Sequence, residues 1–217
     1  LAAMLEVPRE AFVGAAQRDI AYIDEDIRVA ETPEGPRYLM EPSPLAKLIQ
    51  LAEVEPTDAV LDVGCGTGYS AAVLSRLARS VVALESDPAL AEQAAATLAA
   101  QGCHNVTVVK GALAAGSASK GPFDVIVVGG SVDEVPQALL AQLKEGGRLV
   151  AVEGRQGELG PLERAVDQRT AGERRRFRKG DLRPQLAKCV RGASRLGRRY
   201  NIREPSFVHG ETRRRLE

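Results

Sequence analysis

The stretch VLDVGCGTGYS at residues 60–70 decides the fold of this chain. An apolar run carries Asp62 and then breaks into Gly64, Gly66 and Gly68, directly before a helix-forming stretch. Glycines allow a turn that Cβ atoms would block, and they let backbone N–H groups approach a ligand closely. The D-x-G-x-G-x-G order differs from the dinucleotide fingerprint G-x-G-x-x-G, and its leading acid suits a ligand with a positive end and no pyrophosphate. The pattern predicts a strand, a cofactor-binding loop and a helix, with a ligand-free turn as the alternative.

A second acid follows at the end of the next apolar run, VVALE at residues 81–85. Glu85 lies about twenty residues beyond the glycine loop, where an acid at a strand end commonly accepts hydrogen bonds from a ribose 2′-hydroxyl. We therefore expect Glu85 to bind a ribose. Asp87 and Pro88 are the residue types of a helix N-cap and a first helical position, and we expect only that capping role for Asp87.

Apolar runs and helix-forming segments alternate through the first two thirds of the chain. Strands are predicted at residues 60–64, 81–85, 106–110, 124–129 and 148–152. Helices are predicted at residues 45–54, 70–78, 88–101 and 135–143, the last with Gly146-Gly147 as its C-cap. Near-continuous Val, Leu and Ile runs are typical of strands buried on both faces. The alternation predicts an α/β fold with a Rossmann-like, doubly wound, mostly parallel sheet, whose ligand lies beyond the carboxyl ends of the strands.

Composition indicates a globular, cytoplasmic protein. The 217 residues are 44% hydrophobic, and no apolar run approaches the roughly 18 residues of a membrane span. The opening residues lack the long apolar stretch of a signal peptide. Cys65, Cys103 and Cys189 show neither pairing nor metal-ligand spacing, which favours a reducing cytosol. His104 and His209 are the only histidines, so we expect no metal site and read His104 as a turn residue.

Several stretches together resemble the protein-L-isoaspartate O-methyltransferase family. The glycine loop resembles motif I of the S-adenosylmethionine-dependent methyltransferases. Before it, LEVPREAFV, AYIDEDI and RYLMEPSPLAKL follow one another in the family's order and spacing. After it, FDVIVVGGSVDEVPQALLAQLKEGGRLVAVEG resembles the family's fourth and fifth strands and the helix between them. The resemblance covers residues 1–154, and VPREAFV and VPQALLAQLKEGGRLV are its most specific parts.

The resemblance implies a class I methyltransferase that moves a methyl group from S-adenosyl-L-methionine to the carboxylate of an isomerised aspartate, a protein repair reaction. Its partner would be a peptide or protein with an isoaspartyl residue, and we expect a monomer. A carboxylate is already ionised at pH 7 and needs no general base. Such an enzyme mainly aligns oxygen, methyl carbon and sulfur, and excludes water. By resemblance, Asp62 with Gly64, Gly66 and Gly68 forms the cofactor loop, and Glu85 holds the ribose.

The loop on the adenine side departs from the family pattern. The family has Gly-Asp-Gly after the third strand, where the acid contacts adenine, and this chain has Gly111-Ala112-Leu113. Ala112 has no polar side chain, so backbone N–H groups and apolar contacts must serve alone. We therefore expect Gly111 and Ala112 to bind the cofactor through their backbone and through apolar contacts.

The acceptor side departs further. The family's Ile-Ser-x-Pro step, whose serine hydroxyl faces the substrate carboxylate, is replaced by Leu39-Met40-Glu41-Pro42. Met40 stands where the serine belongs, and a thioether cannot donate a hydrogen bond, so core packing is its simpler role. Glu41 adds a negative charge near a negative substrate. Arg37, through a bidentate pair, or Tyr38, through its hydroxyl, would bind the acceptor instead, and a solvated loop arginine is the alternative for Arg37.

Charge is distributed unevenly along the chain. Residues 1–160 hold 12 basic and 22 acidic side chains, whereas residues 161–217 hold 17 basic and 7 acidic ones. The basic end is either a solvated extension or an arm that binds nucleic-acid phosphates. Aromatic residues make up 4% of the chain, too few for interleaved base stacking. The predicted fourth strand also ends in Val128-Gly129-Gly130-Ser131 instead of the Asn/Asp-Pro-Pro-aromatic step of amino-group methyltransferases, so we expect no nucleic-acid partner.

The chain divides into an N-terminal segment on the substrate side (residues 1–44), a cofactor-binding domain (45–154) and a basic, irregular segment (155–217). It starts inside what resembles the family's first helix, so a truncated N-terminus is expected. Residues 155–203 contain no convincing strand, so the family's last two strands are expected to be missing or disturbed. This stretch is either a real basic tail or the product of a reading-frame error, because REPSFV beyond it again resembles the family.

Two alternatives to a repair enzyme remain open. One is a methyltransferase that acts on another acceptor, either a small molecule or a nucleic acid. The other is a non-catalytic module that binds S-adenosylmethionine without turnover, which the exchange of serine for Met40 favours.

Overall fold

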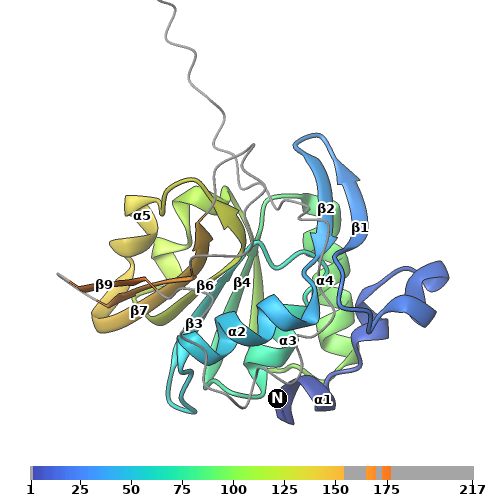
Figure 1. The fold of residues 1–217 in the computed structure, drawn as a ribbon, viewed down its shortest axis with the longest axis horizontal. Coiled ribbons are helices and arrows are strands. Elements are labelled where there is room, and N and C mark those ends of the chain that lie inside the picture. Colours follow the sequence, from blue (N-terminus) through green and yellow to red (C-terminus); the bar gives the residue numbers. More distant parts are fainter. Residues whose placement is uncertain (1, 154–164, 170–172, 177–217) are drawn as a thin grey trace, which may run out of the picture.

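A computed structural model of the chain describes residues 2–153, 165–169 and 173–176. Seven strands form one sheet in the order β5-β4-β3-β6-β7-β8-β9, and β1 and β2 form a separate hairpin. Strands β3 to β7 are parallel to one another, whereas β8 and β9 are antiparallel to their neighbours. The α/β, mostly parallel sheet predicted from the sequence is therefore confirmed (Figure 1).

From α2 to β7 the elements follow the predicted order. The strands are β3 (Ala59–Val63), β4 (Ser80–Glu85), β5 (Val106–Lys110), β6 (Phe123–Val132), β7 (Leu143–Glu153), β8 (Ala165–Arg169) and β9 (Glu173–Arg176). The helices are α1 (Ala2–Glu6), α2 (Pro42–Ala52), α3 (Tyr69–Ser75), α4 (Pro88–Ala100) and α5 (Gln137–Leu140). None of the helices in the described ranges is long and apolar enough to cross a membrane.

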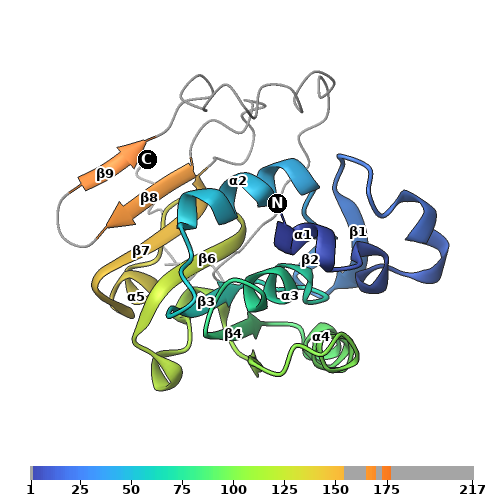
Figure 2. The ribbon, with the colours of Figure 1, turned by 90° about the horizontal axis from the view of Figure 1, so that it is seen from below.

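The sheet is buried on both faces because its central strands are almost wholly apolar. Residues 125–128 of β6 are completely inaccessible to solvent. One face packs against α2, α3 and α4 through Leu48, Val73 and Ala94. The other face packs against α5 through Leu139, and Figure 2 shows α2 and α5 on opposite sides of β6 and β7. Because β3 is flanked by β4 on one side and β6 on the other, the chain reverses its direction of travel across the sheet at β3.

The N-terminal segment contains a hairpin that the sequence did not predict. Strands β1 (Ile27–Thr32) and β2 (Gly35–Leu39) pair antiparallel. Arg37 of β2 reaches Ser86, just beyond the end of β4, at 2.7 Å. This contact places the hairpin at the carboxyl edge of the sheet, beside the start of α4 (Figure 1).

The predicted helix at residues 135–143 was too long. Helix α5 ends at Leu140, and β7 already begins at Leu143. Gly146 and Gly147 lie inside β7, where the pairing with β6 shifts register, so they are not a helix C-cap. A Cβ on Gly147 would lie 2.9 Å from the Lys144 carbonyl oxygen, so the backbone here leaves no room for a side chain.

The expectation that residues 155–203 contain no strand was wrong for the part of this stretch that the structure describes. Residues 165–169 form β8 on β7, and residues 173–176 form β9 on β8. Both are short and mostly polar, with the sequences AVDQR and ERRR, which hid them from a search for apolar runs. The rest of the basic segment, including the stretch ascribed to a tail or a reading-frame error, lies outside the described residues.

Candidate active site

The glycine loop joins β3 to α3 at the carboxyl edge of the sheet. Gly64, Gly66 and Gly68 have φ values of +79°, +56° and +98°, a region that residues with a Cβ rarely adopt. The loop is tied to β4, because the N–H of Gly64 donates to the Leu84 carbonyl at 2.8 Å. A Cβ on Gly66 would meet nothing within 4 Å, so this glycine faces open space. The loop therefore presents its backbone to that space at the predicted place.

Asp62 lies beneath this loop and is fully buried. Its Oδ2 accepts a hydrogen bond from the Ser70 hydroxyl at 2.7 Å, whereas Oδ1 is buried without a partner among the described residues. Burial raises the pKa of Asp62 to about 7, against the opposing effect of the Ser70 bond and with a contribution from Glu85. An acid with an unused buried oxygen is ready for a ligand that brings a donor or a positive charge.

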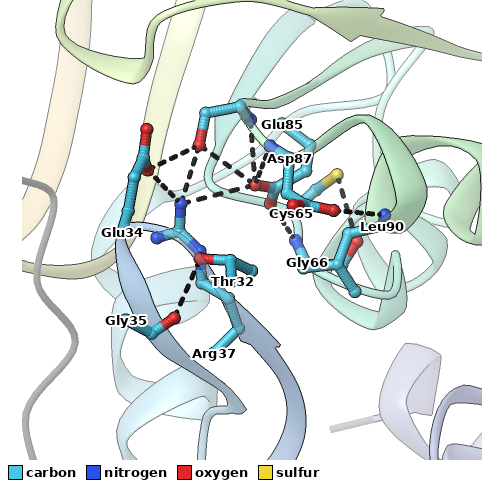
Figure 3. Close-up of polar contacts among 10 residues, drawn as sticks. Thr32, Glu34, Gly35, Arg37, Cys65, Gly66, Glu85, Asp87 and Leu90 are labelled. Carbon is cyan, nitrogen blue, oxygen red and sulfur yellow. Dashed lines mark hydrogen bonds and ion pairs between the residues drawn. The ribbon is translucent and has the colours of Figure 1, made fainter.

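Glu85 is held in place by backbone N–H groups (Figure 3). Its side chain is 1% exposed. Oε2 accepts from the N–H of Gly66 at 2.8 Å, and Oε1 accepts from the N–H groups of Ser86 at 2.8 Å and Asp87 at 3.1 Å. The acid at the tip of β4 is thereby bonded directly to the glycine loop. Two sequence features predicted separately thus form one site.

Asp87 caps α4, as predicted. Its side chain accepts the N–H of Leu90 at 2.9 Å, and Pro88 occupies the first helical position. His104 lies in a turn, as predicted.

Arg37 lies against Glu85 from the hairpin side (Figure 3). Its Nη2 donates to Ser86 Oγ at 2.7 Å and to Glu34 Oε2 at 2.8 Å, and stands 3.7 Å from Glu85 Oε1. Its Nε is buried and has no partner in the described part of the chain. Arg37 is therefore not a solvated loop arginine. The sequence did not reveal its link to Glu85, because 48 positions separate the two residues.

Neither Tyr38 nor Met40 lies beside Glu85 as Arg37 does. Side chains alternate along a strand, so Tyr38 points to the opposite side of β2 from Arg37, and it is half-buried. Met40 is 8% exposed and belongs to the main core cluster, which fits the packing role considered for it. Next to it, the pKa of Glu41 is raised to about 7, mainly by burial and also by the charges of Asp26 and Asp24. Glu41 therefore carries only part of a negative charge near neutral pH.

Gly111 and Ala112 follow β5 at the same edge. The N–H of Gly111 donates to the Glu85 carbonyl at 3.0 Å. A Cβ on Gly111 would come within 3.3 Å of the Leu84 side chain. Ala112 is exposed beside it. These two residues therefore lie at the same carboxyl edge of the sheet as Asp62, the glycine loop and Glu85.

The residues present fit S-adenosylmethionine. Asp62 offers an unsatisfied buried acid, the loop offers glycine backbone facing open space, and Glu85 offers a fixed carboxylate. No group of three or more His, Cys, Asp or Glu side chains suited to a metal ion occurs within residues 2–153, 165–169 and 173–176.

Comparison with known sequences agrees with this geometry. The sequence model of the family described as Protein-L-isoaspartate(D-aspartate) O-methyltransferase (PCMT) matches residues 1–175, beyond the residue 154 at which the resemblance was expected to end. A protein-L-isoaspartate O-methyltransferase from Roseiflexus sp. (strain RS-1) is 41% identical over 160 residues, which are 73% of this chain and 72% of that protein. Protein-L-isoaspartate O-methyltransferase 1 from Rhodopseudomonas palustris (strain HaA2) is also 41% identical, over 69% of this chain and 60% of its own length. The chain thus spans roughly two thirds of such relatives.

Solved structures of the same family share the fold of this chain. A protein-L-isoaspartate O-methyltransferase structure superposes with a TM-score of 0.66 at 30% identity, over 81% of this chain and 59% of that one. A Plasmodium falciparum protein assigned to the same family shares the fold, with a TM-score of 0.62 at 20% identity, over 82% of this chain and 84% of that one. The chain therefore belongs to the protein-L-isoaspartate(D-aspartate) O-methyltransferase family, whose members are S-adenosylmethionine-dependent protein carboxyl methyltransferases.

Proposed function

We propose that this chain methylates the carboxylate of isoaspartyl residues in peptides and proteins, with S-adenosyl-L-methionine as the methyl donor. One observation carries the proposal. The N–H of Gly66, in the glycine loop that follows Asp62, donates a hydrogen bond to Glu85, so the two motifs lie side by side. The structure of the P. falciparum protein contains S-adenosyl-L-homocysteine, the molecule that S-adenosylmethionine becomes once it has given up its methyl group.

The cofactor residues would act through charge and hydrogen bonds. When bound, S-adenosylmethionine supplies an electrophilic methyl group on a positively charged sulfur. Asp62 would balance that positive end, because a nearby cation favours the ionised form of a buried acid. Glu85 would accept the ribose hydroxyls, and its three backbone N–H partners hold it ready. The backbone at Gly111 and Ala112 would line the adenine side.

The acceptor needs orientation more than activation. Its carboxylate is ionised at neutral pH and requires no general base. Met40 has no donor to offer it. We propose Arg37 as the acceptor-binding side chain, because its buried Nε has no partner among the described residues and a guanidinium pairs well with a carboxylate. Tyr38 remains the second choice, and its position on the other side of β2 makes it weaker.

The test is methyl transfer from labelled S-adenosylmethionine to an isoaspartyl peptide, with S-adenosylhomocysteine binding measured by calorimetry. A carboxyl methyl ester is hydrolysed by base, so the label should be released as volatile methanol. Base-stable label would mean another acceptor atom and would contradict the proposal. Cofactor binding without any transfer would support the non-catalytic module, which the buried Met40 at the serine position favours.

The setting of the reaction follows from the chain's chemistry. We propose the cytoplasm, because Cys65 and Cys103 are free, buried thiols, as in a reducing compartment. We also propose that the chain acts as a monomer on protein substrates and not on nucleic acid. The division into an N-terminal segment, a cofactor domain and a basic segment is part of the same proposal.

A further inference from the structure

Arg9 is the largest of the fully buried side chains in the described part of the chain, at 1% exposure. Removing a guanidinium from water is costly unless its N–H groups find acceptors. Its Nε donates to the Ala21 carbonyl and its Nη2 donates to the Met40 carbonyl, each at 2.6 Å. Bonds from a charged donor are shorter and stronger than neutral ones. Arg9 thus ties three parts of the N-terminal segment together around one charge.

The same guanidinium also contacts the helix after the glycine loop. Its Cζ lies 4.8 Å from the centroid of the Tyr69 ring, a cation–π distance. Phe12 packs edge-on against that ring, with centroids 5.5 Å apart. Tyr69 is the first residue of α3 and follows Gly68 directly. Arg9 therefore bridges the acceptor side, at Met40, and the cofactor side, at Tyr69.

We propose that Arg9 is a positioning residue for methyl transfer, which fixes the backbone at Met40 against the first turn of α3. This inference rests on the proposed function. The Met40 side chain has no donor, so an acceptor carboxylate must be located by the chain around it, including Arg37 three positions earlier. A misplacement of about 1 Å between reacting groups costs on the order of 100-fold in rate. Asp62 and Glu85 are held by other contacts, with Ser70 and with backbone N–H groups, so cofactor affinity should not depend on Arg9.

The test compares Arg9→Met and Arg9→Lys with the matched control Arg18→Met. Arg18 is an exposed arginine in the same segment, within the 3-10 turn Ala15–Ile20. Lysine keeps the charge but lacks the fork that serves two carbonyl oxygens at once. Each full-length variant is measured for thermal midpoint, for S-adenosylhomocysteine affinity by calorimetry, for kcat and KM with an isoaspartyl peptide, and for amide hydrogen exchange at residues 38–43.

Arg9→Met should lower kcat/KM at least about 10-fold and speed exchange at residues 38–43. Cofactor affinity should stay within about 3-fold, because Asp62 and Glu85 are held by Ser70 and by backbone N–H groups. Arg9→Lys should fall between, and Arg18→Met should match the wild type. An unchanged kcat/KM, or an equal loss of cofactor affinity and peptide activity, would overturn the inference. If Arg9→Met does not fold, the lysine variant decides by the same criteria.

The proposed function can fail separately. If the wild type binds S-adenosylhomocysteine but methylates no isoaspartyl peptide, the proposed acceptor is wrong. Amide exchange at residues 38–43 then decides the role of Arg9. Faster exchange in Arg9→Met with unchanged cofactor affinity shows that Arg9 fixes the backbone at Met40, and unchanged exchange refutes this.

Discussion

At the scale of single residues, Asp62 provides the most distinctive chemistry of the site. It is fully buried, one carboxylate oxygen has no partner among the described residues, and burial raises its pKa to about 7. The folded protein therefore disfavours the charged form of Asp62 near neutral pH. A positively charged ligand beside it reverses that preference, so binding of the cation and loss of the proton are linked.

Affinity for S-adenosylmethionine should consequently rise with pH. Below a pKa of about 7 the ligand must displace a proton from Asp62, and above it no proton has to leave. We expect tighter binding from about pH 6 to pH 8 and a plateau beyond, by calorimetry. Asp62→Asn should weaken binding about 10-fold and abolish this dependence. S-adenosylhomocysteine, which lacks the sulfonium charge but keeps the ammonium group, is the control ligand and should respond less if Asp62 balances the sulfonium. The same pH profile in Asp62→Asn would contradict this role.

Arg37 can be tested against another arginine of the hairpin. Arg37→Gln should raise KM for an isoaspartyl peptide about 10-fold, because a charge-assisted bond to the acceptor is lost. Arg28→Gln is the matched control, since Arg28 lies on β1, is exposed and pairs with Glu31 at the surface. Steady-state kinetics give KM, and calorimetry gives the S-adenosylhomocysteine affinity. If affinity for the cofactor product falls as much as KM rises, Arg37 serves Glu85 and not the acceptor.

At the scale of elements, the success of sequence reasoning depended on burial. Strands β3 to β7 were predicted because strands buried on both faces must be apolar throughout. Strands β8 and β9 are charged, and the β1–β2 hairpin mixes polar and apolar residues, so neither produces such a run. Helix α4 was placed to within a residue because its Asp-Pro start is a local signal. The end of α5 was missed because it is set by the β6–β7 pairing and not locally.

The cap of α4 offers a prediction at this scale. Asp87→Ala should lower the free energy of unfolding by about 1 kcal/mol, and hence Tm by roughly 2–4 °C. Cofactor affinity should not change, because Glu85 is bonded by the backbone N–H of residue 87 and not by its side chain. Asp133→Ala, at an exposed aspartate outside any helix, is the control for thermal unfolding. A clear loss of cofactor affinity in Asp87→Ala would show that its side chain has a binding role.

At the scale of the whole molecule, the two halves of the site differ in how far they can be read from sequence. The proposed cofactor residues Asp62, the glycine loop and Glu85 lie close together in the chain, so local patterns were enough to select them. The proposed acceptor side involves long-range contacts, such as Arg9 with Met40 and Arg37 with Glu85. Such pairings arise only when the N-terminal segment packs on the sheet, so neither arginine's partner was predictable.

Binding of the cofactor should raise the thermal midpoint of unfolding of the whole chain. A ligand that binds only the folded state at about 100 times its Kd stabilises it by roughly 2.7 kcal/mol. For a chain of this size that raises Tm by about 5–11 °C. We expect this shift with S-adenosylhomocysteine and none with an equal concentration of NAD, because the loop lacks the dinucleotide fingerprint. Equal shifts with both ligands in a thermal scan would contradict the assignment of the loop.

The central claim is that this chain recognises the isomerised aspartate itself. The most direct measurement is the initial rate of methyl transfer, at saturating S-adenosylmethionine, to an isoaspartyl peptide and to its normal aspartyl twin of identical sequence. We predict transfer to the isoaspartyl peptide and negligible transfer to the twin, since only the isomer places its carboxylate at the correct distance from the main chain. Equal rates with both peptides, or no transfer to either while the cofactor binds, would contradict it.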